Sequence, residues 1–179
     1  MKALFLDRDG VINKDHDYIF EIKNFEFLPG IFDLCKAAQK HDYKLFIITN
    51  QSGIGRGYFS ESQYNTLCDW LINKLKTNNI KITKIYSCFS KPDPDENIEN
   101  GILPTDPNRK PNPGMLFQAI DDFKIDPTQS LMIGDKITDL MAAATANIPI
   151  RLLFSEETSS THPAVSHQIK SLNEAIEFL

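Results

Sequence analysis

The sequence predicts an α/β fold in which a mostly parallel sheet is covered by helices on both faces. Short runs rich in Ile, Leu and Phe alternate along the chain with amphipathic stretches, and these runs lack the period-two pattern of half-exposed strands. Strands buried on both faces are typical of parallel sheets. A chain of 179 residues can bury one sizeable core, so a single domain over residues 1–179 is expected.

The individual elements follow from the same pattern. The predicted strands are the apolar runs 3–6, 44–48, 82–88, 131–133 and 150–154. The predicted helices are 31–40, 60–75, 113–123 and 137–146, with a last short helix from residue 172. The helix at Ser60 has the clearest signal, because Ser60 and Gln63 form a capping-box pattern ahead of apolar residues at helical spacing.

Composition excludes several classes of protein. The net charge of -5 argues against a nucleic-acid binder, because affinity for phosphate backbones comes from clustered Lys and Arg. The apolar run before Asp7 is too short for a signal peptide or a membrane span, so we expect a cytoplasmic protein without membrane association. The three cysteines and four histidines show no disulfide framework and no HExxH motif.

The segment 90–113 interrupts the alternation of strands and helices. Six prolines are interleaved there with Asp, Asn and Glu. Loops of this length in compact domains are usually functional.

Three predicted strands end in polar clusters. The clusters are Asp7-Arg8-Asp9-Gly10, Thr49-Asn50-Gln51-Ser52-Gly53 and Gly134-Asp135-Lys136. Ligands of open α/β sheets bind beyond the carboxyl ends of the strands, so the three clusters are expected to converge on one site.

Asp7 and Asp9 are suited to divide the work of phosphoryl transfer. An ionised Asp7 can attack phosphorus, while Asp9 can protonate the leaving alcohol and later take a proton from water. The plain alternative is a polar turn that closes a strand, because Asp and Gly favour turns.

Asp135 favours the catalytic interpretation, because it adds a third carboxylate at another strand end. Adjacent carboxylates need a cation to offset their charge, and hard oxygen ligands suit Mg²⁺. Asp139, one helical turn further on, is expected behind the ligands, although helix capping would also explain it. Thr49, Asn50 and Lys110 are candidates to stabilise the transferred phosphoryl group.

The ordered motifs DRDG, TNQSG, RKP and GDK resemble those of the haloacid dehalogenase superfamily of phosphatases. The resemblance spans roughly residues 1–155 and implies a Rossmann-like sheet with a minimal cap. The segments LDRDGVIN, NFEFLPG, TNQSGIGRGYF and RKPNPGM are similar to those of the subfamily that hydrolyses the 7-phosphate of D-glycero-D-manno-heptose 1,7-bisphosphate. That activity serves heptose biosynthesis for the lipopolysaccharide core or a related glycan.

The resemblance also implies roles for single residues. Asp7 would be the nucleophile and Asp9 the general acid/base, while Thr49 and Lys110 would steady the phosphoryl group. Magnesium would be bound by Asp7, Asp135 and the backbone carbonyl of Asp9. The implied substrate-binding residues are Asp15, His16, Asp17, Tyr18, Asn50, Gln51, Ser52, Arg109 and Lys136. The expected partner is a small phosphorylated sugar bound by a monomer.

The sequence departs from the subfamily pattern in two places. The subfamily commonly binds a structural zinc through a Cys-x-His and a Cys-x-Cys pair before RKP, whereas this chain has Cys88, Ser90, Asp106 and Asn108 there. We therefore expect no structural zinc. The second departure is Asp17, which stands where glycine is usual.

Two other functions remain open at this stage. Histidinol-phosphate phosphatases share the catalytic motifs, and a few loop residues decide between the two substrates. A non-catalytic phosphosugar-binding module belongs to a different class, but all expected catalytic carboxylates are present.

Overall fold

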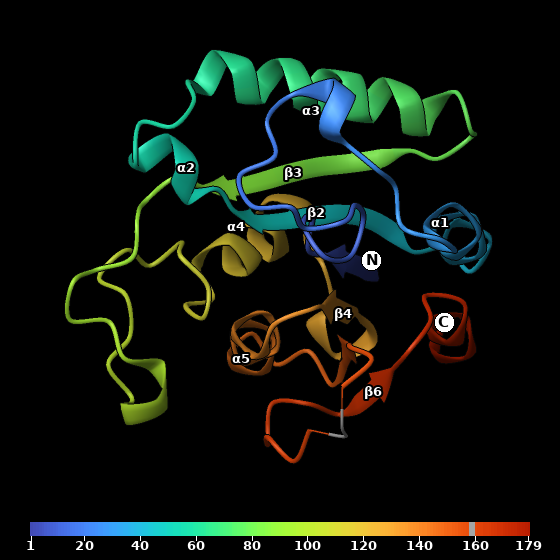
Figure 1. Cartoon of the computed structure of the whole chain (residues 1–179). Coiled ribbons are helices and arrows are strands. Elements are labelled where there is room, and N and C mark those ends of the chain that lie inside the picture. Colours follow the sequence, from blue (N-terminus) through green and yellow to red (C-terminus); the bar gives the residue numbers. More distant parts are fainter. Residues whose placement is uncertain (158–159) are drawn as a thin grey trace.

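The computed structural model describes residues 1–157 and 160–179 (Figure 1). Its centre is a six-stranded sheet with the order β3-β2-β1-β4-β5-β6, and every neighbouring pair is parallel. The strands are β1 (Ala3–Leu6), β2 (Lys44–Asn50), β3 (Ile82–Cys88), β4 (Leu131–Gly134), β5 (Ile150–Phe154) and β6 (His167–Ile169). The predicted α/β fold is confirmed.

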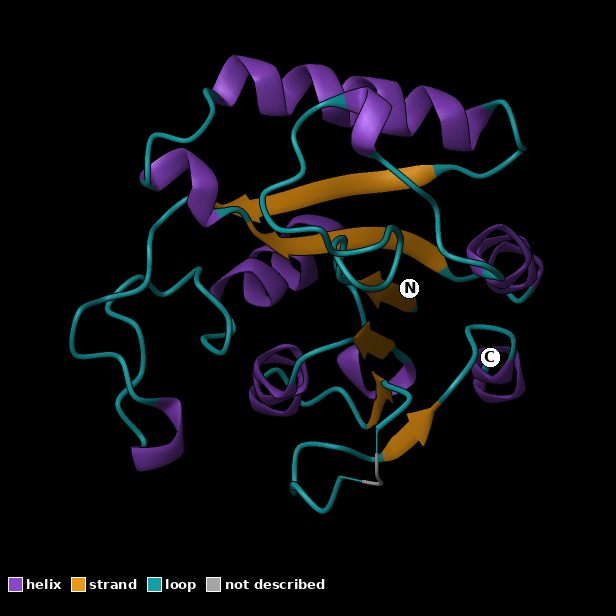
Figure 2. Cartoon of the chain, viewed as in Figure 1, coloured by secondary structure: helices purple, strands orange, loops and turns teal. Residues whose placement is uncertain are grey.

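Helices lie in the connections between successive strands from β1 to β5, as Figure 2 shows. In the described residues the α-helices are α1 (Ile31–Lys40), α2 (Ser52–Gly55), α3 (Glu61–Lys76), α4 (Gly114–Phe123) and α5 (Ile137–Thr145). Short 3-10 helices lie at Ile22–Asn24, Ile98–Asn100, Pro127–Gln129 and Glu174–Phe178. The last of these falls on the terminal helix that the sequence predicts. The capping box of α3 is present, since Ser60 Oγ accepts from Gln63 N and Gln63 Oε1 accepts from Ser60 N.

Alternate residues of β1, β2 and β4 pack into two hydrophobic layers on opposite faces of the sheet. Leu4 and Leu6 pack with the buried residues of α1 and α3, whereas Phe5 packs with those of α4 and α5. Figure 1 shows α3 along one side of the sheet and α4 and α5 on the other. Helical layers on both faces explain why the strands read as continuous apolar runs.

Two elements differ from the sequence prediction. No element was expected at β6, which has only three residues, or at α2, a single turn within the polar cluster after β2. Between β1 and α1 the chain forms no helix beyond the 3-10 turn at Ile22–Asn24, which agrees with a minimal cap. Among the described residues, no helix has the length and apolar character needed to cross a membrane.

Candidate active site

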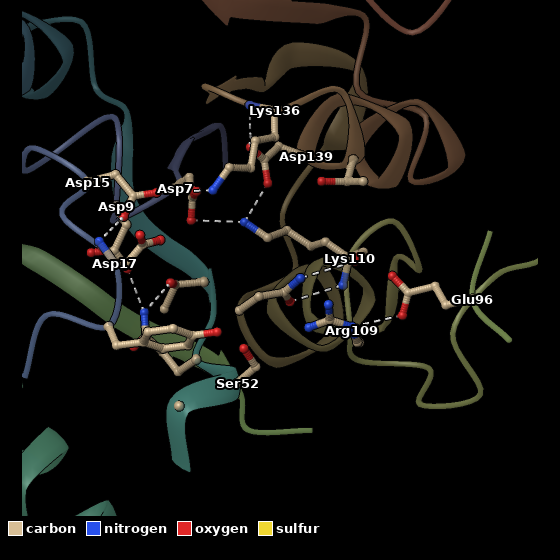
Figure 3. A pocket seen from close by; sticks show the side chains of 16 residues that line it. Asp7, Asp9, Asp15, Asp17, Ser52, Glu96, Arg109, Lys110, Lys136 and Asp139 are labelled. Atoms are coloured by element: carbon tan, nitrogen blue, oxygen red, sulfur yellow. Dashed lines mark hydrogen bonds and ion pairs between the residues drawn. The ribbon is translucent and has the colours of Figure 1, made fainter. Parts of the chain in front are cut away.

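A cavity of about 340 Å³ opens beyond the carboxyl ends of the central strands (Figure 3). The order β2-β1-β4 explains its position, because β1 lies between two strands that also end in polar clusters. The predicted site residues that line it are Asp7, Asp9, Asp15, Asp17, Tyr18, Thr49, Asn50, Gln51, Ser52, Arg109, Lys110 and Lys136. Asp135 is not among the lining residues and lies beside Asp7 and Asp139. The exposed His16 borders a separate hollow with Lys23 and Glu26.

Asp7 is the buried acid at the end of β1, with 6% of its surface exposed. Its backbone N–H donates to the carbonyl of Ile133 on β4, which fixes the start of the loop. Its Oδ1 accepts from the backbone N–H of Arg8 (2.8 Å) and from Lys110 Nζ (2.9 Å). Burial raises the pKa of Asp7 well above its ordinary value; Lys110 opposes this rise, and Asp139 and Asp135 add to it.

Lys110 joins Asp7 to Asp139. Its Nζ donates to the carbonyl of Ile48 at 2.8 Å and lies 2.6 Å from Asp139 Oδ1. Burial by itself would lower the pKa of Lys110, but Asp139 and Asp7 together raise it above its ordinary value. Lys110 is therefore held as a cation next to the carboxylate of Asp7.

The three carboxylates form a cluster that fits a hard cation. Ligand oxygens of Asp7, Asp135 and Asp139 lie within 4.8 Å of one another. Asp135 Oδ1 is buried and has no hydrogen-bond partner in the described chain. Burial, with the charge of Asp139, raises the pKa of Asp135 to about 6. Gly10 keeps the cluster compact, because a Cβ at that position would collide with the Asp135 carboxylate.

Asp139 differs from the other two acids because both of its oxygens are engaged. Oδ1 pairs with Lys110, and Oδ2 accepts from the backbone N–H of Lys136 at 3.1 Å. The unpartnered oxygen belongs to Asp135. This arrangement favours Asp7 and Asp135 as direct metal ligands, with Asp139 behind them.

Asp9 is held by side chains from three directions. Its Oδ2 accepts from Gln51 Nε2 (2.8 Å) and from Arg8, and its Oδ1 accepts from Asn13 Nδ2 (2.9 Å). Arg8 is only 1% exposed, and it also donates to the carbonyl of Ile19. Arg8 and Asn13 were not among the expected site residues, although a basic residue between two acids directly after a buried strand is a usable signal for such a contact.

Arg109 and Lys110 point in different directions from a segment of turns, in which the Arg109 N–H donates to the carbonyl of Asp106 and the Asn112 N–H donates to the carbonyl of Arg109. Lys110 reaches Asp7, whereas Arg109 Nε donates to Glu96 Oε2 at 3.2 Å. Asn50 fixes the segment that carries both, since its side-chain amide donates to the carbonyl of Lys110 and accepts from the Lys110 N–H, each at 3.1 Å.

The segment that contains Asp15 and Tyr18 forms the opposite rim of the cavity. Asp15 Oδ2 accepts from Lys136 Nζ at 3.1 Å, and Tyr18 makes an edge contact with the ring of Tyr58. Asp17 has a φ of 54°, in the left-handed region where glycine is favoured and Asp is tolerated. The replacement of glycine by Asp17 is therefore compatible with this backbone, and the Asp17 N–H donates to Asp15 Oδ1.

The four positions of the usual zinc site are joined by hydrogen bonds. Cys88 Sγ lies 3.1 Å from Ser90 Oγ and 3.3 Å from Asp106 Oδ2. Asp106 Oδ1 accepts from the backbone N–H of Asn108 at 2.8 Å. These hydrogen bonds join the start of the loop, at Cys88 and Ser90, to its later part at Asp106 and Asn108.

Comparisons with known proteins agree with this geometry. The HAD-hydrolase-like family model matches residues 107–175. The chain is 42% identical to D-glycero-alpha-D-manno-heptose-1,7-bisphosphate 7-phosphatase of Campylobacter jejuni over 99% of this chain and 95% of that protein. It is 44% identical to the D-glycero-beta-D-manno-heptose-1,7-bisphosphate 7-phosphatase of Haemophilus influenzae over 85% of this chain and 80% of the relative.

A solved structure shows the same fold over almost the whole chain. The D,D-heptose 1,7-bisphosphate phosphatase from B. bronchiseptica, crystallised with magnesium and phosphate, superposes with a TM-score of 0.83 at 26% identity, covering 99% of this chain and 97% of that chain. This likeness and the 42% identity over nearly the full length show that the chain belongs to the haloacid dehalogenase-like hydrolases, in the family of the heptose-1,7-bisphosphate 7-phosphatases.

Proposed function

We propose that this chain is a Mg²⁺-dependent phosphoric monoester hydrolase that removes the 7-phosphate of D-glycero-D-manno-heptose 1,7-bisphosphate in heptose biosynthesis. The observation that carries the proposal is the contact of 2.9 Å between Lys110 Nζ and Asp7 Oδ1, at the base of a cavity that Arg109 also lines. Such a site offers one cation to the reacting phosphate and a second cation to a phosphate at the other end of the substrate.

Asp7 and Asp9 carry the two chemical steps. In the first, an Asp7 carboxylate oxygen forms a bond to phosphorus, the bond between phosphorus and the C7 oxygen breaks, and Asp9 donates a proton to that oxygen. In the second, a water oxygen attacks the phosphorus of the aspartyl phosphate. Asp9 takes its proton, inorganic phosphate leaves, and the Asp7 carboxylate is restored.

Lys110 and Thr49 act as donors to the phosphoryl oxygens during both steps. Lys110 is suited to this because its ammonium group is already fixed by Asp139 and the Ile48 carbonyl, so little reorganisation accompanies the reaction. When bound, Mg²⁺ supplies the positive charge that keeps the clustered carboxylates ionised beside a phosphate. Asp7, Asp135 and the Asp9 carbonyl are the groups that would hold it.

Arg109 is assigned to the phosphate that does not react. A bidentate arginine contact orients a phosphate, and binding energy at that end can support the reaction at the other. Arg109→Ala should therefore lower kcat/KM for the bisphosphate by roughly 1.5–3 kcal/mol, with a much smaller loss for an aryl phosphate. Equal losses with both substrates would move Arg109 into the phosphoryl-transfer machinery.

A substrate screen tests the function directly. We expect the α and β anomers of heptose 1,7-bisphosphate to be hydrolysed with a kcat/KM far above that for histidinol phosphate, because relatives of this chain are named for both anomers. Analysis of the product should show loss of the phosphate at C7. Faster hydrolysis of histidinol phosphate would reject the heptose assignment, and absence of hydrolysis with any phosphate ester would favour a binding module.

A further inference from the structure

One acidic residue of the proline-rich loop faces the cavity at a distance from the carboxylate cluster. Glu96 lines the cavity, and its side chain is only 14% exposed. In the view of Figure 3, Arg109 lies between Glu96 and Ser52, while Asp7 and Asp139 lie in another part of the site. We propose that Glu96 is a positioning residue that acts through Arg109 and sets how tightly the cavity holds the non-reacting phosphate. This inference rests on the proposed function.

The contacts of Arg109 define what the guanidinium can offer. Its Nε donates to Glu96 Oε2 at 3.2 Å, and its Nη1 donates to the carbonyl of Ser90 at 3.4 Å. Nη2 contacts no acceptor in the described part of the chain. Glu96 and Ser90 therefore fix the orientation of the group and leave one nitrogen with two N–H donors for a ligand.

Glu96 is itself held by the loop and does not depend on Arg109 for its position. Its backbone N–H donates to the carbonyl of Asp93 at 3.1 Å, and its Oε2 accepts from the Asp93 N–H at 3.3 Å. The carboxylate of Asp93 in turn accepts from the N–H and the hydroxyl of Thr105. The turn that begins at Asp93 thus places the Glu96 carboxylate before any ligand binds.

Two effects of Glu96 on phosphate binding have opposite signs. Its negative charge repels a phosphate bound at Arg109, which weakens binding. Its hydrogen bond restricts the Arg109 side chain before the phosphate arrives, so less conformational entropy is lost on binding. The side chains of Glu96 and Arg109 are 14% and 11% exposed, so the pair keeps a defined geometry. Because this geometry is set before a phosphate arrives, we assign the larger effect to positioning.

Three variants separate these effects. Glu96→Ala removes both the charge and the acceptor, whereas Glu96→Gln keeps an acceptor oxygen and removes the charge. Glu99→Ala is the matched control, because Glu99 is an exposed acid of the same loop. We expect Glu96→Ala to raise KM for heptose 1,7-bisphosphate about fivefold, as for the loss of one hydrogen bond, with kcat little changed. Glu96→Gln should recover most of this loss, and Glu99→Ala should behave as wild type.

A double-mutant cycle with Arg109→Ala supplies the decisive test. If Glu96 acts through Arg109, Glu96→Ala has no further effect on kcat/KM in the Arg109→Ala background. The proposal is overturned if Glu96→Ala lowers kcat/KM as much in the Arg109→Ala background as in the wild type. It is also overturned if Glu96→Ala raises kcat/KM, or if it lowers kcat/KM equally with an aryl phosphate.

The same cycle can be measured without heptose turnover. Inhibition of aryl phosphate hydrolysis by fructose 1,6-bisphosphate gives an inhibition constant for each variant. If the wild type hydrolyses the aryl phosphate but not the heptose bisphosphate, the proposed function is wrong, and these inhibition constants still decide whether Glu96 and Arg109 are coupled. Melting temperatures of all variants show whether any loss reflects unfolding.

Discussion

Lys110 and Asp139 form an ion pair in which Nζ and Oδ1 are 2.6 Å apart and each side chain is only 2% exposed. The same ammonium group lies 2.9 Å from Asp7. We therefore expect Asp139 to influence the reaction through Lys110, without contact between Asp139 and the metal.

Asp139→Asn should lower kcat by about 10- to 100-fold with any phosphate ester, because it removes a charged hydrogen-bond partner of Lys110. The Mg²⁺ concentration for half-maximal activity should stay close to that of the wild type. Asp135→Asn is the comparison variant, and it should raise that concentration by more than about tenfold because it removes a direct ligand. If Asp139→Asn raised the required Mg²⁺ concentration and Asp135→Asn did not, Asp139 would be the direct ligand and Asp135 would not.

Asp7→Asn should abolish turnover and leave the protein folded, because it removes the attacking oxygen anion. In Mg²⁺-free buffer its melting temperature should not fall below that of the wild type. Burial raises the pKa of Asp7, so its ionised form at neutral pH opposes folding, and the neutral amide avoids this cost. Turnover close to the wild-type rate would indicate direct attack by water.

Asp9→Asn should slow turnover of a sugar phosphate by about 10²–10⁴-fold, the usual contribution of a general acid/base. The loss should be smaller with aryl phosphates whose leaving groups need no proton. Arg8 also loses its charged partner, so the free energy of unfolding should fall by up to about 3 kcal/mol. The rates should be measured at a temperature where the variant is folded. An equal loss of turnover rate across a series of leaving groups would argue against proton donation by Asp9.

Mg²⁺ binding should depend on pH through Asp135. Burial and Asp139 raise the pKa of this carboxyl to about 6, so in Mg²⁺-free buffer it opposes folding increasingly as pH rises from about 4 to about 6. Mg²⁺ requires the ionised form, so the rise in melting temperature on adding Mg²⁺ should be larger at about pH 7.5 than at about pH 5. An equal rise at both values would show that Asp135 is not a ligand.

Metal analysis of the purified protein should find no stoichiometric zinc. Cys88 supplies one thiolate at most, and Ser90 and Asp106 approach it as hydrogen-bond partners. Cys88→Ser keeps a group that can hydrogen-bond, and it should leave the activity unchanged. If the wild type contained one zinc ion per chain and Cys88→Ser contained none, the loop would hold a structural zinc and the prediction would be wrong.

The sequence predicts most of the sheet, because the apolar residues of β1, β2 and β4 identify these strands without knowledge of the strands they pair with. Their ends also place Asp7, Thr49 and Asp135 at one edge of the sheet, since parallel strands share a direction. A three-residue strand such as β6 has too few positions to show a pattern, and its burial depends on residues of β5.

The partners of the site residues are harder to predict than the residues themselves. The contact of Lys110 with Asp7 spans 103 positions, and that of Gln51 with Asp9 spans 42. No local pattern encodes such pairs, because they depend on how two loops pack. Gln51 was expected to contact the substrate, whereas it donates to Asp9. Glu96 was not expected in the site, because its pairing with Arg109 depends on a turn within an irregular loop.

The position of β1 in the middle of the sheet also affects how activity can return after denaturation. Its partners β2 and β4 come from opposite halves of the chain, and Lys110 and Asp139 both lie far from Asp7 in sequence. Pairings between such distant segments form slowly, because a long loop must be closed first. Phosphatase activity should therefore recover later than the far-UV circular dichroism signal of the helices. An activity assay during refolding would then report when the last pairings form.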